Sequence, residues 1–247
     1  LLPLGRRKRL INKYISLLES VEGGSVRGRY SFISLKPDLI WKCHGEKAEV
    51  KRNPEEEDAS FSQCEQPTLN ALRSLIEESK LELPEELPPM AAGLIGYLGY
   101  DTVRLTEDIP DKNPDTINIP DGLFMRPTIM VVFDSVTHTI KIVTPVRWTP
   151  QSNAEGEYLS ASQRLNTVIL ALNTDIGKRH SINAKKHLPT PVPISNVGRD
   201  GYHDMVNKAK EYIRKGDVFQ VVPSQRLTQI FSYKPFSLYR SLRILNP

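Results

Sequence analysis

The residue types that most often carry catalysis are spread along this chain without the spacing that a catalytic motif requires. Gly93, Gly96 and Gly99 form a GxxGxxG pattern, but no Lys-Ser or Lys-Thr pair follows it as in a phosphate-binding loop. The five histidines form neither an HExxH motif nor an i,i+4 pair, and no GxSxG nucleophile motif occurs. We interpret the glycines structurally, as positions where a strand bends or another backbone approaches closely. These patterns alone leave the function open.

Charge and hydrophobicity along the chain argue against nucleic acid and membranes as partners. The 247 residues include 33 basic and 29 acidic side chains, with a formal net charge of +4. Five basic residues precede the first acid, Glu19, and without them the net charge is −1. A basic surface for nucleic acid is therefore not expected on the folded body. No apolar run approaches the ~18 residues that cross a bilayer, so no membrane partner is expected either.

The two cysteines, Cys43 and Cys64, form neither a disulfide framework nor a CxxC or Cys/His cluster. A structural zinc site is therefore not expected, and a cytoplasmic location fits best. The chain starts at Leu1 without Met and stops at Pro247 without a capping signal, so we interpret both ends as cuts.

Elements that could position functional residues are indicated by periodicity. Alternating residues over 26–33, repeated at Leu39, Trp41 and Cys43, predict strands. The β-branched runs 128–134 and 139–144 flank a four-residue connection, which is typical of an antiparallel hairpin. Amphipathic stretches predict helices over 68–80, with Thr68 as N-cap, and over 153–173. This order favours an α+β fold with antiparallel β-sheets and packed helices.

A proline-rich segment divides the chain. Residues 185–199 contain Pro189, Pro191 and Pro193 and lack periodicity, which predicts a stiff linker between a domain over 1–184 and a second one over 200–247. In the second part, Asp200 is expected to cap a helix that ends at Gly216. A strand over 217–222 is expected to follow.

Four motifs carry a resemblance to a known family. The segments LLESVEGG (17–24), GRYSFI (28–33) and GLIGYLGYD (93–101) closely resemble the N-terminal region of the large, chorismate-binding subunit of anthranilate synthase, component I. GDVFQVVPSQR (216–226) resembles the opening of that family's chorismate-binding domain. Ser34 departs from the pattern, because a glycine is commoner there. The resemblance implies a regulatory domain over 1–184 and the truncated start of the catalytic domain over 200–247.

The resemblance also implies a reaction. Chorismate is aminated with ammonia that a glutamine amidotransferase subunit supplies, and anthranilate and pyruvate are formed in tryptophan biosynthesis. The family uses Mg²⁺ held by carboxylates. Those ligands lie beyond Pro247 in the family, so we expect no metal ligand within this chain and no activity of this chain alone.

Gln220 is the candidate catalytic residue. In the predicted strand it shares a face with Val218 and Val222. Water-adding relatives carry a lysine at this place, which can act as a base. An amide can only orient a nucleophile by hydrogen bonds, which suits ammonia. The alternative is a buried glutamine that satisfies backbone groups.

Glu19, Ser20 and Ser31 are the candidate ligands of a tryptophan feedback site. A free amino acid requires an acid, hydroxyl donors and an apolar slot, and Leu18, Tyr30 and Phe32 could line the slot. The family forms this site from the LLES segment and a segment that begins at Asn246. From the residues alone, Glu19-Ser20 is also typical of a solvated turn.

Two other functions remain open. Aminodeoxychorismate synthase also adds ammonia and also carries a glutamine at the place of Gln220. A non-catalytic tryptophan-binding module would bind the amino acid without turning over chorismate. Thermal stabilisation by tryptophan is expected of the module and of an intact regulatory site.

Overall fold

The computed structural model describes residues 14–19, 28–88, 90–147, 152–174 and 191–245 of the chain. By its internal contacts the chain forms two compact units, Leu1–Asp175 and Ile176–Pro247, and each is described by itself. Residues 185–190 of the predicted linker lie outside the described residues. Its later part includes strand β8 (Ile194–Ser195), which pairs with β9 (Leu227–Thr228), and the start of helix α3 (Gly198–Lys215).

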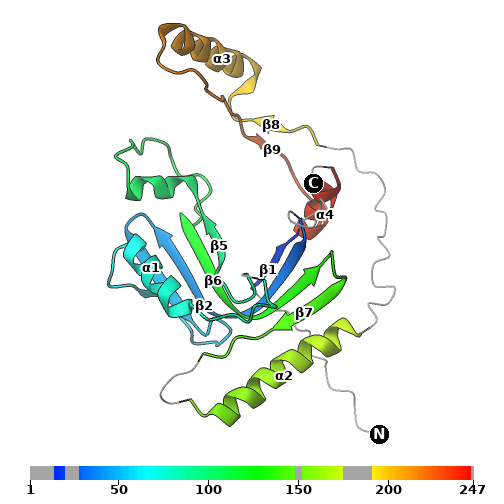
Figure 1. Cartoon of the computed structure of the whole chain (residues 1–247). Coiled ribbons are helices and arrows are strands. Elements are labelled where there is room, and N and C mark those ends of the chain that lie inside the picture. Colours follow the sequence, from blue (N-terminus) through cyan, green and yellow to red (C-terminus); the bar gives the residue numbers. More distant parts are fainter. Residues whose placement is uncertain (1–13, 20–27, 89, 148–151, 175–190, 246–247) are drawn as a thin grey trace. The chain divides into compact units, whose positions relative to one another are not determined.

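The first unit is built on one antiparallel sheet (Figure 1). Its strands lie in the order β4-β3-β2-β6-β5, while β1 pairs with β2 and β7 pairs with β6. The strands are β1 (Ile15–Leu18), β2 (Tyr30–His44), β3 (Lys47–Arg52), β4 (Ser62–Gln63), β5 (Ile95–Leu98), β6 (Gly122–Asp134) and β7 (Thr139–Val143). The sheet and its packed helices confirm the α+β prediction. The predicted hairpin is confirmed as β6 and β7, which pair from Asp134↔Thr139 onward.

The two helices predicted in this unit are confirmed, with one change at a helix start. Helix α2 (Ala154–Leu172) is capped by Asn153, whose side chain accepts a hydrogen bond from Glu155 N at 3.2 Å. Helix α1 (Thr68–Ser79) begins after Pro67, so Thr68 is not the N-cap. The Thr68 hydroxyl instead donates to the Gly45 carbonyl at 2.7 Å. This bond attaches the start of α1 to the β2–β3 turn. A short 3₁₀ helix, η1 (Tyr100–Leu105), follows β5.

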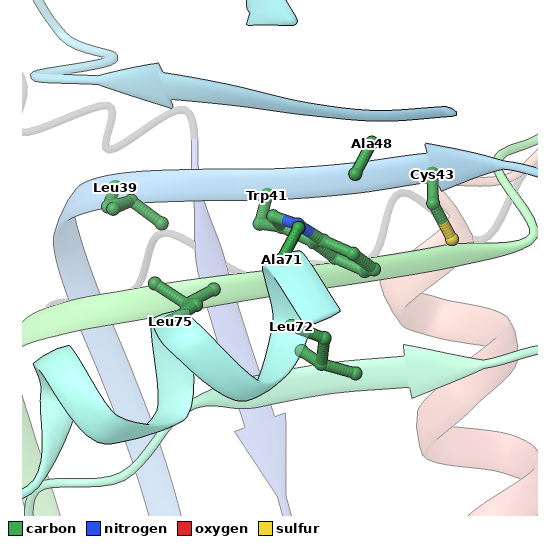
Figure 2. Packing of buried hydrophobic residues seen from close by; sticks show 7 residues of the cluster. All are labelled: Leu39, Trp41, Cys43, Ala48, Ala71, Leu72 and Leu75. Atoms are coloured by element: carbon green, nitrogen blue, oxygen red, sulfur yellow. The ribbon is translucent and has the colours of Figure 1, made fainter. Parts of the chain in front are cut away.

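The core of this unit lies where the helices pack on the sheet. Figure 2 shows Leu39, Trp41 and Cys43 of β2 packed against the apolar side of α1. The three residues of β2 are fully buried, as the alternation predicted. Helix α2 contributes Val168 to a second cluster with Ile129 and Val131 of β6. Each half of the long central strands is therefore held by its own helix.

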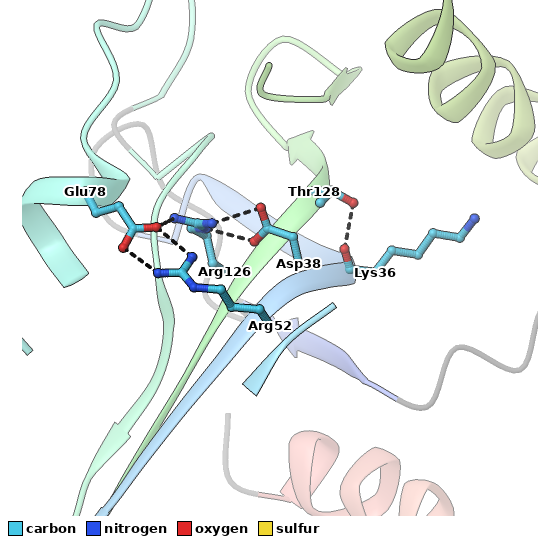
Figure 3. Close-up of polar contacts among 6 residues, drawn as sticks. All are labelled: Lys36, Asp38, Arg52, Glu78, Arg126 and Thr128. Carbon is cyan, nitrogen blue, oxygen red and sulfur yellow. Dashed lines mark hydrogen bonds and ion pairs between the residues drawn. The ribbon is translucent and has the colours of Figure 1, made fainter. Parts of the chain in front are cut away.

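The pairing of β2 with β6 is interrupted where two prolines face each other. Pro37 pairs with Pro127, the register shifts between Pro37 and Leu39, and Lys36 has a φ of 48°. Proline has no N–H for the ladder, so bonds are lost here. Thr128 Oγ1 donates to the Lys36 carbonyl at 2.6 Å and holds the strands together (Figure 3).

Gly96 is the glycine that the fold requires most strictly. A Cβ atom at this position would lie 1.9 Å from the Leu123 carbonyl oxygen and 2.7 Å from Phe124 Cα. At Gly99 a Cβ would lie 3.1 Å from the Asp121 carbonyl oxygen, whereas at Gly93 nothing lies within 4 Å. Close backbone approach therefore explains Gly96 and Gly99, but not Gly93.

The described residues of the second unit, 191–245, form two helices and a two-stranded sheet. They are β8 (Ile194–Ser195), α3 (Gly198–Lys215), β9 (Leu227–Thr228) and α4 (Pro235–Leu245). Helix α3 ends as predicted, with Gly216 in the left-handed conformation at φ 80°. Its start differs, because Val197 precedes the helix and Asp200 lies within the first turn. Ser195 Oγ accepts hydrogen bonds from the amides of Val197 and Gly198. Among the described residues, no helix has the length and apolar character needed to cross a bilayer.

Candidate inhibitor site and catalytic glutamine

Two of the three predicted inhibitor ligands lie at the same end of one strand pair. Strand β1 pairs with β2 from Ile15↔Leu35 to Leu18↔Phe32. Glu19 follows Leu18 directly, and Ser31 precedes Phe32 on β2. Continued by one step, this register places Glu19 opposite Ser31. The third predicted ligand, Ser20, lies outside the described residues.

The apolar slot predicted beside these residues has a different composition. Side chains alternate along a strand, so Ser31 lies on the opposite face of β2 from Tyr30 and Phe32. The rings of Tyr30 and Phe32 lie 6.0 Å apart between centroids and pack in a cluster with Met130 and Val132. Tyr30 and Phe32 therefore do not line an apolar slot on the face of Ser31, and this part of the prediction is wrong. The face of Ser31 holds Ile33 and, directly across on β6, Phe133.

The start of β2 is anchored by an ion pair whose two residues are far apart in the sequence. Arg29 Nε and Nη2 donate to the two carboxylate oxygens of Asp134 at 2.9 and 2.6 Å. The bonds from Arg29, helped by the amides of Val136 and Thr137, lower the pKa of Asp134. Ser135 donates from both its amide and its hydroxyl to the Arg29 carbonyl. These bonds fix the backbone two residues before Ser31.

A charge network centred on the buried Arg126 lies at the proline interruption. The Arg126 side chain is 7% exposed, and it donates to Asp38 at 2.8 and 3.1 Å and to Glu78 of α1 at 2.8 Å (Figure 3). Arg52 donates to the same Glu78 carboxylate at 2.9 and 3.0 Å. The bonds from Arg52 and Arg126 outweigh burial and lower the pKa of Glu78 to about 2. The network joins β2, β3, β6 and α1.

Gln220 lies outside any strand. Residues 217–222 form no strand, and the Gln220 side chain is exposed. Its neighbours Phe219 and Val222 are 96% and 77% exposed. The strand prediction is therefore wrong for this structure, because alternating residues form a strand only where a second strand accepts their backbone hydrogen bonds. The catalytic role of Gln220 stays a prediction.

No metal centre is found in the part of the chain that the structure describes, because no three His, Cys, Asp or Glu side chains there could hold a metal ion together. The described residues therefore offer no set of carboxylates that fits a Mg²⁺ site. A cavity of about 660 Å³ does lie beside β5, but its lining, which includes Tyr97, Arg104 and Asp121, contains none of the predicted site residues.

The chain as a whole matches one family. The model of the chorismate binding enzyme family matches residues 28–247. The chain therefore belongs to the chorismate binding enzyme family.

Within that family, the chain is similar to proteins of one kind. It is 43% identical over 237 residues to anthranilate synthase component 1 of Cereibacter sphaeroides. The aligned region covers 94% of this chain and 46% of the relative. It is 34% identical to anthranilate synthase component 1 of Neisseria meningitidis, and that aligned region covers 99% of this chain and 49% of the relative. The crystal structure of anthranilate synthase component I from Streptococcus pneumoniae TIGR4 matches with a TM-score of 0.66 at 26% identity, over 92% of this chain and 48% of that chain. These matches confirm the resemblance, and the chain spans about half the length of these relatives.

Proposed function

We propose that this chain is the N-terminal part of the large subunit of an anthranilate synthase. The observation that carries the proposal is the similarity to anthranilate synthase component 1 along 94% of the chain. The complete protein converts chorismate and ammonia to anthranilate, pyruvate and water. The ammonia is released from glutamine by a separate amidotransferase subunit. Free thiols at Cys43 and Cys64 suit a reducing cytoplasm.

The role we propose for Gln220 follows from the chemistry of its amide. The side chain neither gains nor loses a proton near neutral pH, so it does not act as a base. Its carbonyl oxygen and its NH₂ group can orient ammonia and the chorismate ring by hydrogen bonds. Ammonia already carries the lone pair that attacks the ring, so orientation is sufficient. In the complete protein, residues outside this chain would cover Gln220 and supply the ligands for Mg²⁺.

The second part of the proposal is feedback inhibition by tryptophan at the end of the β1–β2 pair. The Glu19 carboxylate would accept hydrogen bonds from the ligand ammonium group, and the hydroxyls of Ser20 and Ser31 would contact its polar atoms. Ile33 and Phe133, on the face of Ser31, provide apolar surface for a side chain. The anchoring of β2 by Arg29 and Asp134 supports this assignment, because ligands bind best to preorganised groups.

The test compares the 247-residue chain with the full-length protein. With chorismate, Mg²⁺ and an ammonium salt, the full-length protein should form fluorescent anthranilate, and the 247-residue chain should not. Mass spectrometry of the product separates anthranilate from aminodeoxychorismate. Anthranilate from the 247-residue chain, or aminodeoxychorismate from the full-length protein, would contradict the proposal.

A variant pair tests Gln220 itself. In the full-length protein, Gln220→Lys should lower ammonium-dependent anthranilate formation by at least about tenfold, because an amine replaces the orienting amide. Gln229→Lys is the matched control, since Gln229 is also exposed in the second unit. Equal activity of the two variants would assign Gln220 a structural role only.

A further inference from the structure

Strand β1 leads directly into Glu19, one of the proposed inhibitor ligands, but the strand is short and its apolar ends are exposed. It has four residues, and Ile15 and Leu18 are 52% and 43% exposed. Its apolar residues lie on both faces, because Ile15 and Leu17 share one side and Leu18 lies on the other. A strand with this composition does not specify its register by hydrophobic pattern, since a shift of one residue still places apolar side chains on each face.

One polar contact distinguishes the observed register from shifted ones. Ser16 pairs with Ser34 of β2, and their two hydroxyls form a hydrogen bond with each other. Ser34 is 3% exposed, so its hydroxyl has little access to water. After a shift of one residue, Ser16 would face Ile33 or Leu35, and both hydroxyls would lose this partner. A buried Ser34 hydroxyl without a partner disfavours such a state.

The same register decides where Glu19 lies. A shift of one residue moves Glu19 by about 3.3 Å and turns its side chain to the other face. It would then no longer lie opposite Ser31. The position of the proposed ammonium ligand therefore depends on the contact three residues earlier, between Ser16 and Ser34.

We infer that the Ser16–Ser34 hydroxyl pair fixes the register of β1 and is a positioning pair for the amino-acid inhibitor. The inference rests on the proposed tryptophan regulation. Neither serine contacts the ligand in this scheme. Each acts through the position of Glu19.

The test measures tryptophan binding by titration calorimetry to the full-length protein carrying Ser34→Ala, Ser16→Ala or both changes. Each single change should raise the Kd for tryptophan about fivefold, the effect of one net hydrogen bond. The double variant should also be about fivefold weaker, since both changes remove the same bond. Ser16→Thr keeps the hydroxyl on the half-buried edge strand and should retain the parent Kd. The kcat and the KM for chorismate should not change.

Thr128→Val is the matched control. It removes a hydroxyl bond from the same sheet, to the Lys36 carbonyl, without touching β1, and it should leave the Kd unchanged. If Ser16→Ala and Ser34→Ala bind tryptophan within twofold of the parent, or if their effects multiply in the double variant, the inference is refuted while the regulation stands. If the parent itself does not bind tryptophan, the regulation is refuted, and the inference with it.

Discussion

Gly96→Ala tests whether β5 and β6 approach as closely as the structure indicates. The new Cβ would lie 1.9 Å from the Leu123 carbonyl oxygen, where contacts shorter than 3.0 Å do not occur in real proteins. The two strands must therefore separate by roughly 1 Å. The backbone of β6 is held by its pairing with β2 on the other side, so the shift falls on β5.

The size of the effect follows from what β5 holds. Its four residues pair with β6 from Ile95↔Met125 to Leu98↔Gly122, and Ile95 is 6% exposed in the cluster with Phe32 and Met130. Stretching these hydrogen bonds and loosening Ile95 should cost about 3 kcal/mol. For a unit of this size, the melting temperature should fall by roughly 6–12 °C.

The assay is thermal unfolding of the chain, followed by circular dichroism, for a graded set of alanine variants. Gly93→Ala is the matched control, because nothing lies within 4 Å of its new Cβ, and it should shift the melting temperature by less than about 2 °C. Gly122→Ala should lie between the two, since its Cβ would meet the movable Leu98 side chain at 2.8 Å. If Gly96→Ala melts within 1 °C of Gly93→Ala, the close approach of β5 to β6 is refuted.

Three further predictions concern charge, thiol reactivity and ligand binding. Hydrogen bonds from Arg52 and Arg126 lower the pKa of Glu78 to about 2, so its contribution to stability is complete above about pH 4.5 and is lost as the pH falls toward 2. Glu78→Gln should therefore flatten the decline in urea midpoint between pH 5 and pH 2.5, and a decline as steep as that of the parent would contradict the network. Burial raises the pKa of Cys43 to about 11, so iodoacetamide at pH 8 should label Cys64 well before Cys43, as peptide mass spectrometry would show; equal rates would exclude the packing of Cys43 under α1. In the full-length protein, Glu19→Gln should weaken tryptophan inhibition about tenfold with unchanged kcat, because the ligand ammonium loses a charged acceptor, and an unchanged inhibition curve would remove Glu19 from the site.

The parts of the fold that the sequence predicted are those that local chemistry decides. The β6–β7 hairpin is short-range, and its β-branched residues and four-residue turn lie within one stretch of chain. Helix α2 has its cap at Asn153 and its buried stripe at Ala161 and Val168. The left-handed Gly216 ends α3. In each case the residues that determine the element belong to the element.

The parts that could not be predicted depend on residues far apart in the sequence. Arg126 is bonded to Asp38 and Glu78, which lie 88 and 48 residues before it, and no periodicity marks such a set. Arg29 and Asp134 are 105 residues apart. The pairing of β2 with β6 brings Arg126 next to Asp38 and Arg29 next to Asp134, and this long-range pairing is not encoded in any local pattern.

Gln220 and Glu19 illustrate the same limit at the candidate sites. The sequence over 217–222 alternates like a strand, but a strand also needs a neighbouring strand, and these residues form none in the structure, where no described residue of the second unit is buried. Glu19 has such a neighbour, because β1 pairs with β2 as far as Leu18↔Phe32 and the next step of this register places Glu19 opposite Ser31. The proposed tryptophan site can therefore be tested through the positions of Glu19 and Ser31, which both lie in the first unit. The catalytic half depends on residues that must cover Gln220, and its test belongs to the full-length protein.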